Sequence, residues 1–272
     1  MEGIDTSKLE RLRVRQVGRR VEIELARPDR RNALDFAMWD ELDEVLRSVG
    51  ECDGDVRVVT VTGEGSAFCA GVDFEAIGES LGIERRRYPS FIRRWAGVAD
   101  RFERIPQTTI AAINGPAVGA GLEIALACDI RIAGDRSSFC LPQMQMGIVP
   151  DAGGTSRLAK VVGPSLAKDM VLSCRVVGPD EALRSGLVSR LVAHDALAAE
   201  LDGLASQIET LPWPAAYFAT VAIDVGPQLD PRRAADIEGI ADQVMLRHEE
   251  VLGRVETFQQ TKGLKGLQAP LR

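Results

Sequence analysis

Histidine is nearly absent from this chain, since only His194 and His248 occur among its 272 residues. A metal site built from several histidines is therefore excluded, and a Ser-His-Asp triad is disfavoured. The sequence also lacks an apolar run long enough to cross a bilayer, and Met1 to Arg20 is polar and charged rather than leader-like. We therefore expect no bound metal, no membrane association and a cytoplasmic location.

Cysteines are few, and positive charge is not in excess. The five cysteines, Cys52, Cys69, Cys128, Cys140 and Cys174, are odd in number and form no CxxC pair. This pattern is typical of reduced thiols that mostly lie in a core. The net charge of −7 and the isoelectric point of about 5.1 disfavour a nucleic-acid partner.

Strand and helix patterns alternate along most of the chain. Short aliphatic, β-branched runs predict strands at 12–17, 21–25, 56–61, 108–113 and 130–133. Apolar residues at helical spacing predict helices at 35–49, with Asp35 as the N-cap, and at 91–104, 119–128 and 151–162. A mobile surface segment is predicted at 78–88 and an irregular one at 141–147. This alternation indicates an α/β fold with parallel strands.

The pattern changes after Leu191. Helical spacing at 196–209, 215–223 and 234–258, interrupted by prolines, predicts a helical C-terminal region. A hydrophobic content of 45% in 272 residues is enough for one large core with an appendage. We therefore divide the chain into a core at 1–194 that holds the site and a helical region at 195–272 for oligomerisation.

One glutamate stands alone in an apolar helix. Glu123 is the sole ionisable residue between Val118 and Cys128, and it follows the small residues Gly119 to Gly121. A buried carboxylate must be paired or neutralised, and a helix N-terminus offers backbone N–H groups that can hold an anion. The segment therefore indicates a proton-transfer site. The alternative is that the glycines only allow close packing and that the helix dipole favours the Glu123 charge.

Four segments together resemble the crotonase (enoyl-CoA hydratase/isomerase) superfamily. They follow the family's order along nearly the whole chain, as Arg27-Pro28 with Asn32-Ala33-Leu34, then 67–73 (AFCAGVD), 114–129 and 147–155 (GIVPDAGGT). The resemblance implies a spiral of ββα units followed by helices that build a homotrimer, often paired into a hexamer. It also implies an acyl-CoA thioester as substrate, with coenzyme A as part of that substrate and no separate cofactor.

The resemblance implies an oxyanion hole made by the backbone N–H groups of Val72 and Ala120. Deprotonation next to a thioester develops negative charge on the thioester oxygen. Preorganised donors typically contribute about 3–4 kcal/mol each to such a transition state. The family usually has glycine where Ala120 stands, so the added methyl group narrows the pocket while the backbone donor remains.

This chain departs from the hydratases of the family at a second glutamate. Hydratases hold and activate water with two glutamates, of which the first corresponds to Glu123 and the second to Gln143. A glutamine can bind water but cannot exchange a proton near neutral pH, and loss of one acid–base partner typically costs about 10²–10⁴-fold in rate. Asp151 stands at or near the position where several isomerases of the superfamily place a catalytic carboxylate. The alternative role for Asp151 is an N-cap of the helix that follows.

The resemblance also implies contacts with the CoA moiety. We expect them from Arg30, Arg31, Ala70, Asp73, Phe258 and Lys262. The two arginines stand where relatives meet the CoA phosphates, although arginines in a loop are often only solvated. The last two residues match a C-terminal pattern that covers the adenine from a neighbouring subunit in relatives.

Three functions compete. The favoured one is isomerisation of an enoyl-CoA double bond through an enolate, with Asp151, with or without Glu123, carrying the proton. The first alternative is hydration of an enoyl-CoA by Glu123 with Gln143 as a water anchor, and the second is acyl-CoA binding without catalysis. The acyl group is expected to contact residues 74–88 and parts of the C-terminal helices.

Overall fold

The computed structural model describes residues 6–52, 56–84 and 86–261. Within them, the main sheet has six strands in the order β1-β2-β3-β4-β6-β8. These strands span Leu12–Val17, Arg20–Leu25, Val58–Gly63, Thr108–Ile113, Ile130–Gly134 and Arg190–Val192. β1 and β2 form the antiparallel hairpin that the sequence predicts, and all later neighbours are parallel. A second sheet pairs β5 (Pro116–Val118) with β7 (Ser138–Cys140) in parallel. The α/β fold with parallel strands is confirmed.

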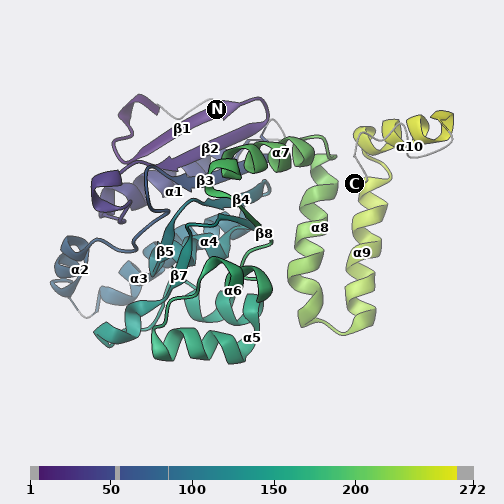
Figure 1. Cartoon of the computed structure of the whole chain (residues 1–272). Helices are drawn as coiled ribbons and strands as arrows, with labels where there is room; N and C mark the ends of the chain where they lie inside the picture. The colour runs from purple at the N-terminus through teal and green to yellow at the C-terminus, as the bar shows by residue number, and fades with distance from the viewer. Residues whose placement is uncertain (1–5, 53–55, 85, 262–272) are drawn as a thin grey trace.

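Helices surround the sheets on both sides (Figure 1). The helices of the core are α1 (Phe36–Gly50), α2 (Phe74–Leu81), α3 (Tyr88–Arg104), α4 (Ala120–Ala127), α5 (Gly154–Ser173) and α6 (Pro179–Arg184). Those that follow β8 are α7 (Leu197–Glu209), α8 (Trp213–Val225), α9 (Pro231–Met245) and α10 (Glu249–Thr261). Short 3₁₀ turns lie at Thr6–Lys8, Pro28–Arg30, Pro142–Met146, His194–Ala196 and Gly226–Gln228.

Helix α1 forms as its sequence predicts. The Asp35 carboxylate accepts a hydrogen bond from the backbone N–H of Met38 over 2.8 Å, which caps a helix end that has no intrahelical acceptor there. The buried side chains of α1 repeat at helical spacing, and they are Met38, Trp39, Leu42, Val45, Leu46 and Val49. This face packs against α3 and the sheet, so α1 fixes one wall of the region where α2 and α3 meet.

Several boundaries differ from the sequence predictions. The third strand runs from Val58 to Gly63 rather than over 56–61, because its parallel pairing with β2 extends to Gly63 opposite Leu25. The segment at 78–88, predicted as a mobile surface segment, begins with the last turn of α2, and Asp73 caps that helix by accepting from the Glu75 N–H. Its mobility stays a prediction. Helix α3 begins at Tyr88, three residues before the predicted start.

Helix α5 and the C-terminal helices carry two further differences. The predicted end of a helix at Val162 coincides with a kink, because Gly163 takes φ 79° and ψ 158° ahead of Pro164, after which the chain is helical to Ser173. The single helix predicted over 234–258 is wrong, since the chain breaks between α9 and α10. There the His248 ring nitrogen Nδ1 accepts from the backbone N–H of Glu250 and starts the last helix.

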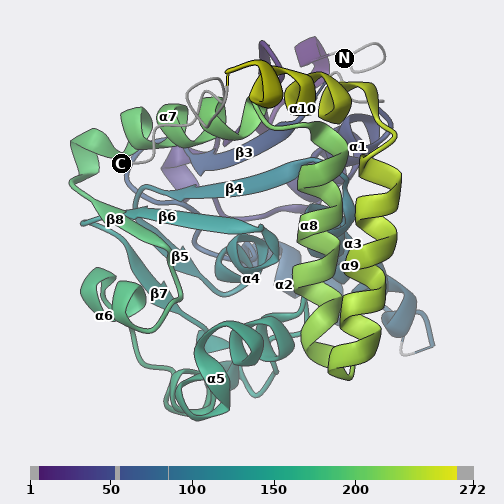
Figure 2. The ribbon, with the colours of Figure 1, turned by 90° about the vertical axis from the view of Figure 1, so that its right-hand side faces the viewer.

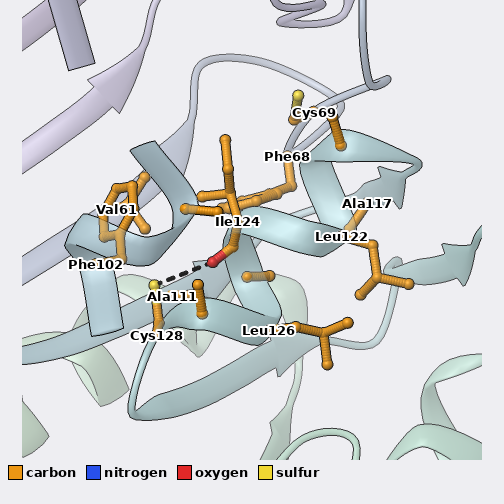
Figure 3. Close-up of a cluster of buried hydrophobic side chains, with 14 of the residues drawn as sticks. Val61, Phe68, Cys69, Phe102, Ala111, Ala117, Leu122, Ile124, Leu126 and Cys128 are labelled. Carbon is orange, nitrogen blue, oxygen red and sulfur yellow. Dashed lines mark hydrogen bonds between the residues drawn. The ribbon is translucent and has the colours of Figure 1, made fainter. Parts of the chain in front are cut away.

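The core surrounds α4, and every residue of α4 from Ala120 to Ala127 is buried. Figure 3 shows Leu122, Ile124 and Leu126 packed among side chains of β3, β4 and α3, together with Phe68. A helix that is apolar on all sides must be enclosed by protein on all sides. Any charge on α4 is therefore held in surroundings with little water.

The C-terminal helices lie in two settings. Helix α7 packs on β3, β4 and β6, where Leu197, Leu204 and Ala205 join a second apolar cluster with the sheet. Helices α8 and α9 run side by side in both views, and α10 extends beyond them (Figures 1 and 2). No helix among the described residues is long and apolar enough to cross a membrane.

Candidate active site

Glu123 is held in one orientation by three hydrogen bonds. Its Oε1 accepts from the backbone N–H groups of Ala152 and Gly154, each over 2.9 Å. Its Oε2 accepts from Nε2 of Gln143 over 3.1 Å. The residue is 1% exposed. The buried carboxyl is therefore not a surface charge favoured only by the helix dipole, and it has the partners that burial requires.

Glycine allows the close approach of the loop that holds Glu123. A Cβ atom at Gly154 would lie 2.6 Å from Glu123 Oε1 and 2.6 Å from the Cβ of Pro150. No real Cβ atom tolerates such contacts, so the second glycine of the Gly153-Gly154 pair lets the backbone reach the carboxylate. Gly153 is the N-cap of α5, with φ at 91°, and no side chain caps that helix.

The two predicted oxyanion-hole segments lie against each other. Two hydrogen bonds form the bridge between Leu34 and Val72: the Leu34 N–H donates to the Gly71 carbonyl, and the Asp73 N–H donates to the Leu34 carbonyl. The Val72 N–H therefore points to the opposite side of that segment. Ala120 is the first residue of α4, a position whose N–H has no intrahelical acceptor. A Cβ built on Gly71 would lie 3.6 Å from the Ala120 nitrogen. The geometry thus places both backbone donors at one site.

A cavity of about 270 Å³ joins these groups. It is lined by Val72 and Ala120, which carry the two backbone N–H groups, and by the polar residues Glu123, Gln143 and Asp151. The remaining lining is mainly apolar and comes from α1, α2, α3 and the loop after β7. A larger hollow of about 440 Å³ between α1 and α3 contains neither Glu123 nor the two donors.

Asp151 lies at the cavity and does not cap α5. The N-cap of that helix is Gly153, and no side chain accepts a capping hydrogen bond there, so the N-cap alternative is wrong. The Asp151 carboxyl is solvent-accessible, and partial burial against the cavity wall raises its pKa above the ordinary value. Its negative charge also raises the pKa of Glu123, as expected for two carboxyls that line one cavity.

Burial raises the pKa of Glu123 to about 7. The hydrogen bonds from Gly154 and Ala152 and the positive charge of Arg157 oppose this rise, whereas the charge of Asp151 adds to it. A carboxyl with a pKa near neutrality can both accept and return a proton under ordinary conditions. The arrangement therefore suits general acid–base chemistry beside the backbone N–H groups of Val72 and Ala120.

Four of the predicted CoA contacts lie near this cavity in the fold. Arg30 is exposed and pairs with Glu75 over 3.5 Å, while the Arg31 carbonyl accepts from the Ala70 N–H. Ala70 lines the cavity. The Asp73 carboxylate is buried and caps α2 while it pairs with Arg27 over 3.0 Å, so its charge already has structural partners.

The other two predicted CoA contacts are not brought to the cavity within this chain. Phe258 belongs to α10, which Figure 1 places on the opposite side of the molecule from α2. Lys262 lies outside the described residues. None of the described C-terminal helix residues lines the cavity, whereas Phe74, Ile77, Ser80 and Tyr88 from the predicted acyl wall do.

The sequence analysis missed a residue that supports the loop around Glu123. Arg157 donates from one guanidinium nitrogen to the Ala152 carbonyl over 2.9 Å, and it pairs with Asp100 and Glu103 of α3, each over 2.6 Å. The only sequence signal for it is an arginine about one turn into the helix predicted at 151–162. Among the described residues, no group of three or more His, Cys, Asp or Glu side chains could hold a metal ion.

The six-stranded, mainly parallel sheet with its helices, together with the match to a solved enoyl-CoA hydratase, defines a crotonase-fold protein. The chain belongs to the enoyl-CoA hydratase/isomerase family, whose model matches residues 19–245. This result confirms the family that the four sequence segments indicate.

Individual relatives agree with this membership. A short-chain-enoyl-CoA hydratase of Clostridium acetobutylicum is 33% identical over 245 residues, which cover 90% of this chain and 92% of the relative. The crystal structure of an enoyl-CoA hydratase from Bacillus anthracis matches with a TM-score of 0.86 at 31% identity, over 93% of this chain and 97% of that one. A Thermobifida fusca protein provisionally named an enoyl-CoA hydratase, solved in complex with CoA, matches with a TM-score of 0.82 at 30% identity, over 89% and 96%.

The names of these relatives bear on the choice between reactions. They are hydratase names, so they favour the alternative of hydration and give no support to the preference for isomerisation that the sequence suggests. That preference rests on Gln143 and Asp151 alone.

Proposed function

We propose that this chain is an enzyme that acts on an enoyl-CoA thioester and stabilises its enolate. One observation carries the proposal: Glu123, a buried carboxyl with a pKa of about 7, lines the same cavity as Val72 and Ala120, whose backbone N–H groups are the donors. The complex of the Thermobifida fusca relative with CoA supports an acyl-CoA substrate. Coenzyme A enters with the substrate in this proposal, and no other cofactor is required.

Within this class, the polar groups of the site favour migration of a double bond. A carboxylate removes a proton from C2 of a 3-enoyl-CoA, and the electron pair spreads to the thioester oxygen as a dienolate. The same proton returns at C4, which leaves the double bond between C2 and C3 and restores the carboxylate. This sequence needs a proton carrier and no activated water. Glu123 and Asp151 supply carboxyls, while Gln143 holds Glu123 by hydrogen bonding without exchanging a proton.

The Asp151→Asn variant tests this assignment. We expect isomerisation of a 3-enoyl-CoA to fall by about 10²-fold or more, because a group that carries the proton is lost. The affinity for CoA should stay nearly unchanged, since the amide has the size of the carboxyl. A matched control is Asp236→Asn on the exposed surface of α9, which should keep full activity. Full isomerase activity in Asp151→Asn would show that Asp151 does not carry the proton.

Hydration is the second candidate, and the names of the relatives favour it. Here Glu123 acts as base on a water that Gln143 anchors, and water adds across the C2–C3 bond of a 2-enoyl-CoA. Parallel assays of the wild type on crotonyl-CoA and on a 3-enoyl-CoA decide between the two reactions. Fast hydration with negligible isomerisation would establish the hydratase, and CoA binding without either reaction would indicate a binding protein.

Assembly into a homotrimer or hexamer through the C-terminal helices is part of the proposal. Exposed apolar side chains on α8, α9 and α10 support it, among them Ile223, Ile240 and Leu252. Large apolar groups of this kind mark contact surfaces when they gather on one part of a protein. Light scattering coupled to size-exclusion chromatography measures the mass directly, and a monomer at micromolar concentration would overturn this part.

A further inference from the structure

Aromatic side chains are scarce in the chain, yet five of them line the cavity. The sequence contains only 3 Trp, 2 Tyr and 8 Phe. The cavity is lined by Trp39, Phe74, Tyr88, Phe91 and Trp95, which we call the aromatic wall. They come from α1, α2 and α3, so three helices converge to place rings at one site.

The rings of the aromatic wall contact one another in defined orientations. Trp39 and Trp95 are stacked, with centroids 4.7 Å apart and planes 22° apart. Phe91 lies 5.3 Å from Trp95 and 6.1 Å from Tyr88 between ring centroids. Behind them, Phe36 meets Phe91 and Trp95 edge-on. Rings braced in this way are preorganised for a ligand and lose little freedom when it binds.

Helix packing explains only part of the aromatic wall. Trp39 is 1% exposed and belongs to the core between α1 and α3. In contrast, Phe74 is 80% exposed and Tyr88 is 40% exposed, although both line the cavity. Burial of apolar surface is favourable, so these two side chains gain from a ligand that covers them. The same cavity contains Glu123 and the two backbone donors, so that ligand is continuous with the reacting thioester.

We propose that the acyl group of the substrate carries an aromatic ring, which binds against the aromatic wall. The inference rests on the proposed function, because the thioester carbonyl must lie at the Val72 and Ala120 donors for the acyl group to reach these rings. An aryl group pairs with protein rings in offset or edge-to-face geometry and gains beyond the burial of its area. A straight alkyl chain gains from area alone and gives up more rotational freedom on binding. The wall is therefore selective for a ring over a straight chain of equal carbon number.

Direct binding of non-reacting thioesters tests this proposal without any turnover. Isothermal titration calorimetry of the full-length wild type would compare phenylacetyl-CoA with octanoyl-CoA, which has the same number of acyl carbons, and with free CoA. We expect phenylacetyl-CoA to bind about 2- to 10-fold more tightly than octanoyl-CoA, the preference that one or two ring pairs provide. Both thioesters should bind more tightly than free CoA.

Ring-removing variants connect the preference to the wall. Phe91→Leu and Phe74→Leu keep an apolar side chain but lose the ring, so each should reduce the preference for phenylacetyl-CoA and leave octanoyl-CoA binding nearly unchanged. Phe74→Leu alters an exposed position and should not affect folding. The control Tyr217→Leu removes a ring of α8 that does not line the cavity, and it should keep the preference.

The outcomes separate this proposal from the proposed function. Equal or tighter binding of octanoyl-CoA by the wild type would overturn the aromatic acyl group and leave the acyl-CoA enzyme standing. A preference that survives both ring-removing variants would overturn the role of the aromatic wall. Failure of all thioesters and of CoA to bind would overturn the proposed function itself, and the aromatic acyl group with it.

Discussion

Nε2 of Gln143 donates a hydrogen bond to Oε2 of Glu123 over 3.1 Å, inside a site where both side chains are buried. The donor end of the amide therefore faces the carboxylate, which is the arrangement that suits an ionised Glu123. The other end of the amide, Oε1, is buried with no partner among the described residues. When Glu123 takes up a proton, the carboxyl becomes a donor, and a rotation of the amide brings Oε1 to accept from it. Gln143 can thus hold Glu123 in either protonation state without transferring a proton itself.

Replacing Gln143 with glutamate places a second carboxyl at hydrogen-bond distance from Glu123. We expect hydration of crotonyl-CoA to increase in Gln143→Glu, by up to about 10²-fold, because the site gains the acid–base partner that it lacks. A spectrophotometric assay of crotonyl-CoA disappearance measures the change. The size-matched control Gln143→Met supplies no exchangeable proton and should show no increase. If the wild type is already fast and Gln143→Glu is no faster, then Gln143 does not limit hydration.

The pH dependence follows from the raised pKa of Glu123. Its ordinary value is 4.5 and burial raises it to about 7, so between these values the folded protein holds a proton that the unfolded chain releases. Stability therefore falls as the pH rises from about 4.5 to about 7 and is level above that window. If the ionised carboxylate is the base, kcat/KM rises over the upper part of the same window, with its midpoint near pH 7.

Asp151 affects the pH at which the acid limb of kcat/KM has its midpoint. Its negative charge is one of the causes that raise the Glu123 pKa, so Asp151→Asn should move the acid limb of residual kcat/KM to lower pH. A pH–rate profile of both proteins measures the shift, and Asp236→Asn serves as the control that leaves the limb in place. An acid limb below pH 5 in the wild type would show that Glu123 is not the titrating base.

Local patterns in the sequence predicted the α/β fold and the helix that carries Glu123, whereas the resemblance to the family indicated Val72 and Ala120. Alternating apolar runs set the strands, and Asp35 caps α1 as its residue type predicts. The hydrogen bonds to Glu123 could not be predicted in this way. They come from Gln143, Ala152 and Gly154, which lie at least 20 residues away along the chain.

Long-range packing also explains the other misses. Arg157 supports the loop only because α3 brings Asp100 and Glu103 to it, and no pattern within α5 predicts that meeting. The aromatic wall depends on the crossing of α1 and α3, whose rings lie about fifty residues apart in sequence. The sequence alone could not decide whether Asp151 is a base or an N-cap. An aspartate shortly before a helix fits both roles, and the structure shows that this helix starts only at Gly154.

A methyl group at Gly154 should disable the site. In Gly154→Ala the new Cβ would lie 2.6 Å from Glu123 Oε1, so the carboxyl or the loop must shift. We expect kcat to fall by about 10²-fold, the usual effect of a displacement near 1 Å at a reacting group, with a loss of stability of about 1–3 kcal/mol. The control Gly203→Ala, in a helix with nothing within 4 Å of the new Cβ, should be neutral or slightly stabilising. Wild-type kcat in Gly154→Ala would show that Glu123 does not need its present position.

Arg157 should act on the reaction through the loop that it holds. Arg157→Met removes the hydrogen bond to the Ala152 carbonyl and the ion pairs with Asp100 and Glu103. The two carboxylates are partly exposed, so the cost in stability should stay near 1–3 kcal/mol, below that of a fully buried pair.

A change in activity separates a positioning role from a purely structural one. Because the charge of Arg157 lowers the Glu123 pKa, Arg157→Met should move the acid limb of kcat/KM to higher pH, in the direction opposite to Asp151→Asn. It should also lower kcat more than it raises KM, since the cavity walls that hold the acyl group remain. The matched control Arg101→Met breaks a pair with Asp43 on the surface of α3 and should change stability only slightly, with no shift of the limb. Urea unfolding measures the change in stability, and pH–rate profiles of the two variants measure the shift of the acid limb. If the acid limb of kcat/KM in Arg157→Met stays at the wild-type pH, this arginine contributes to stability only.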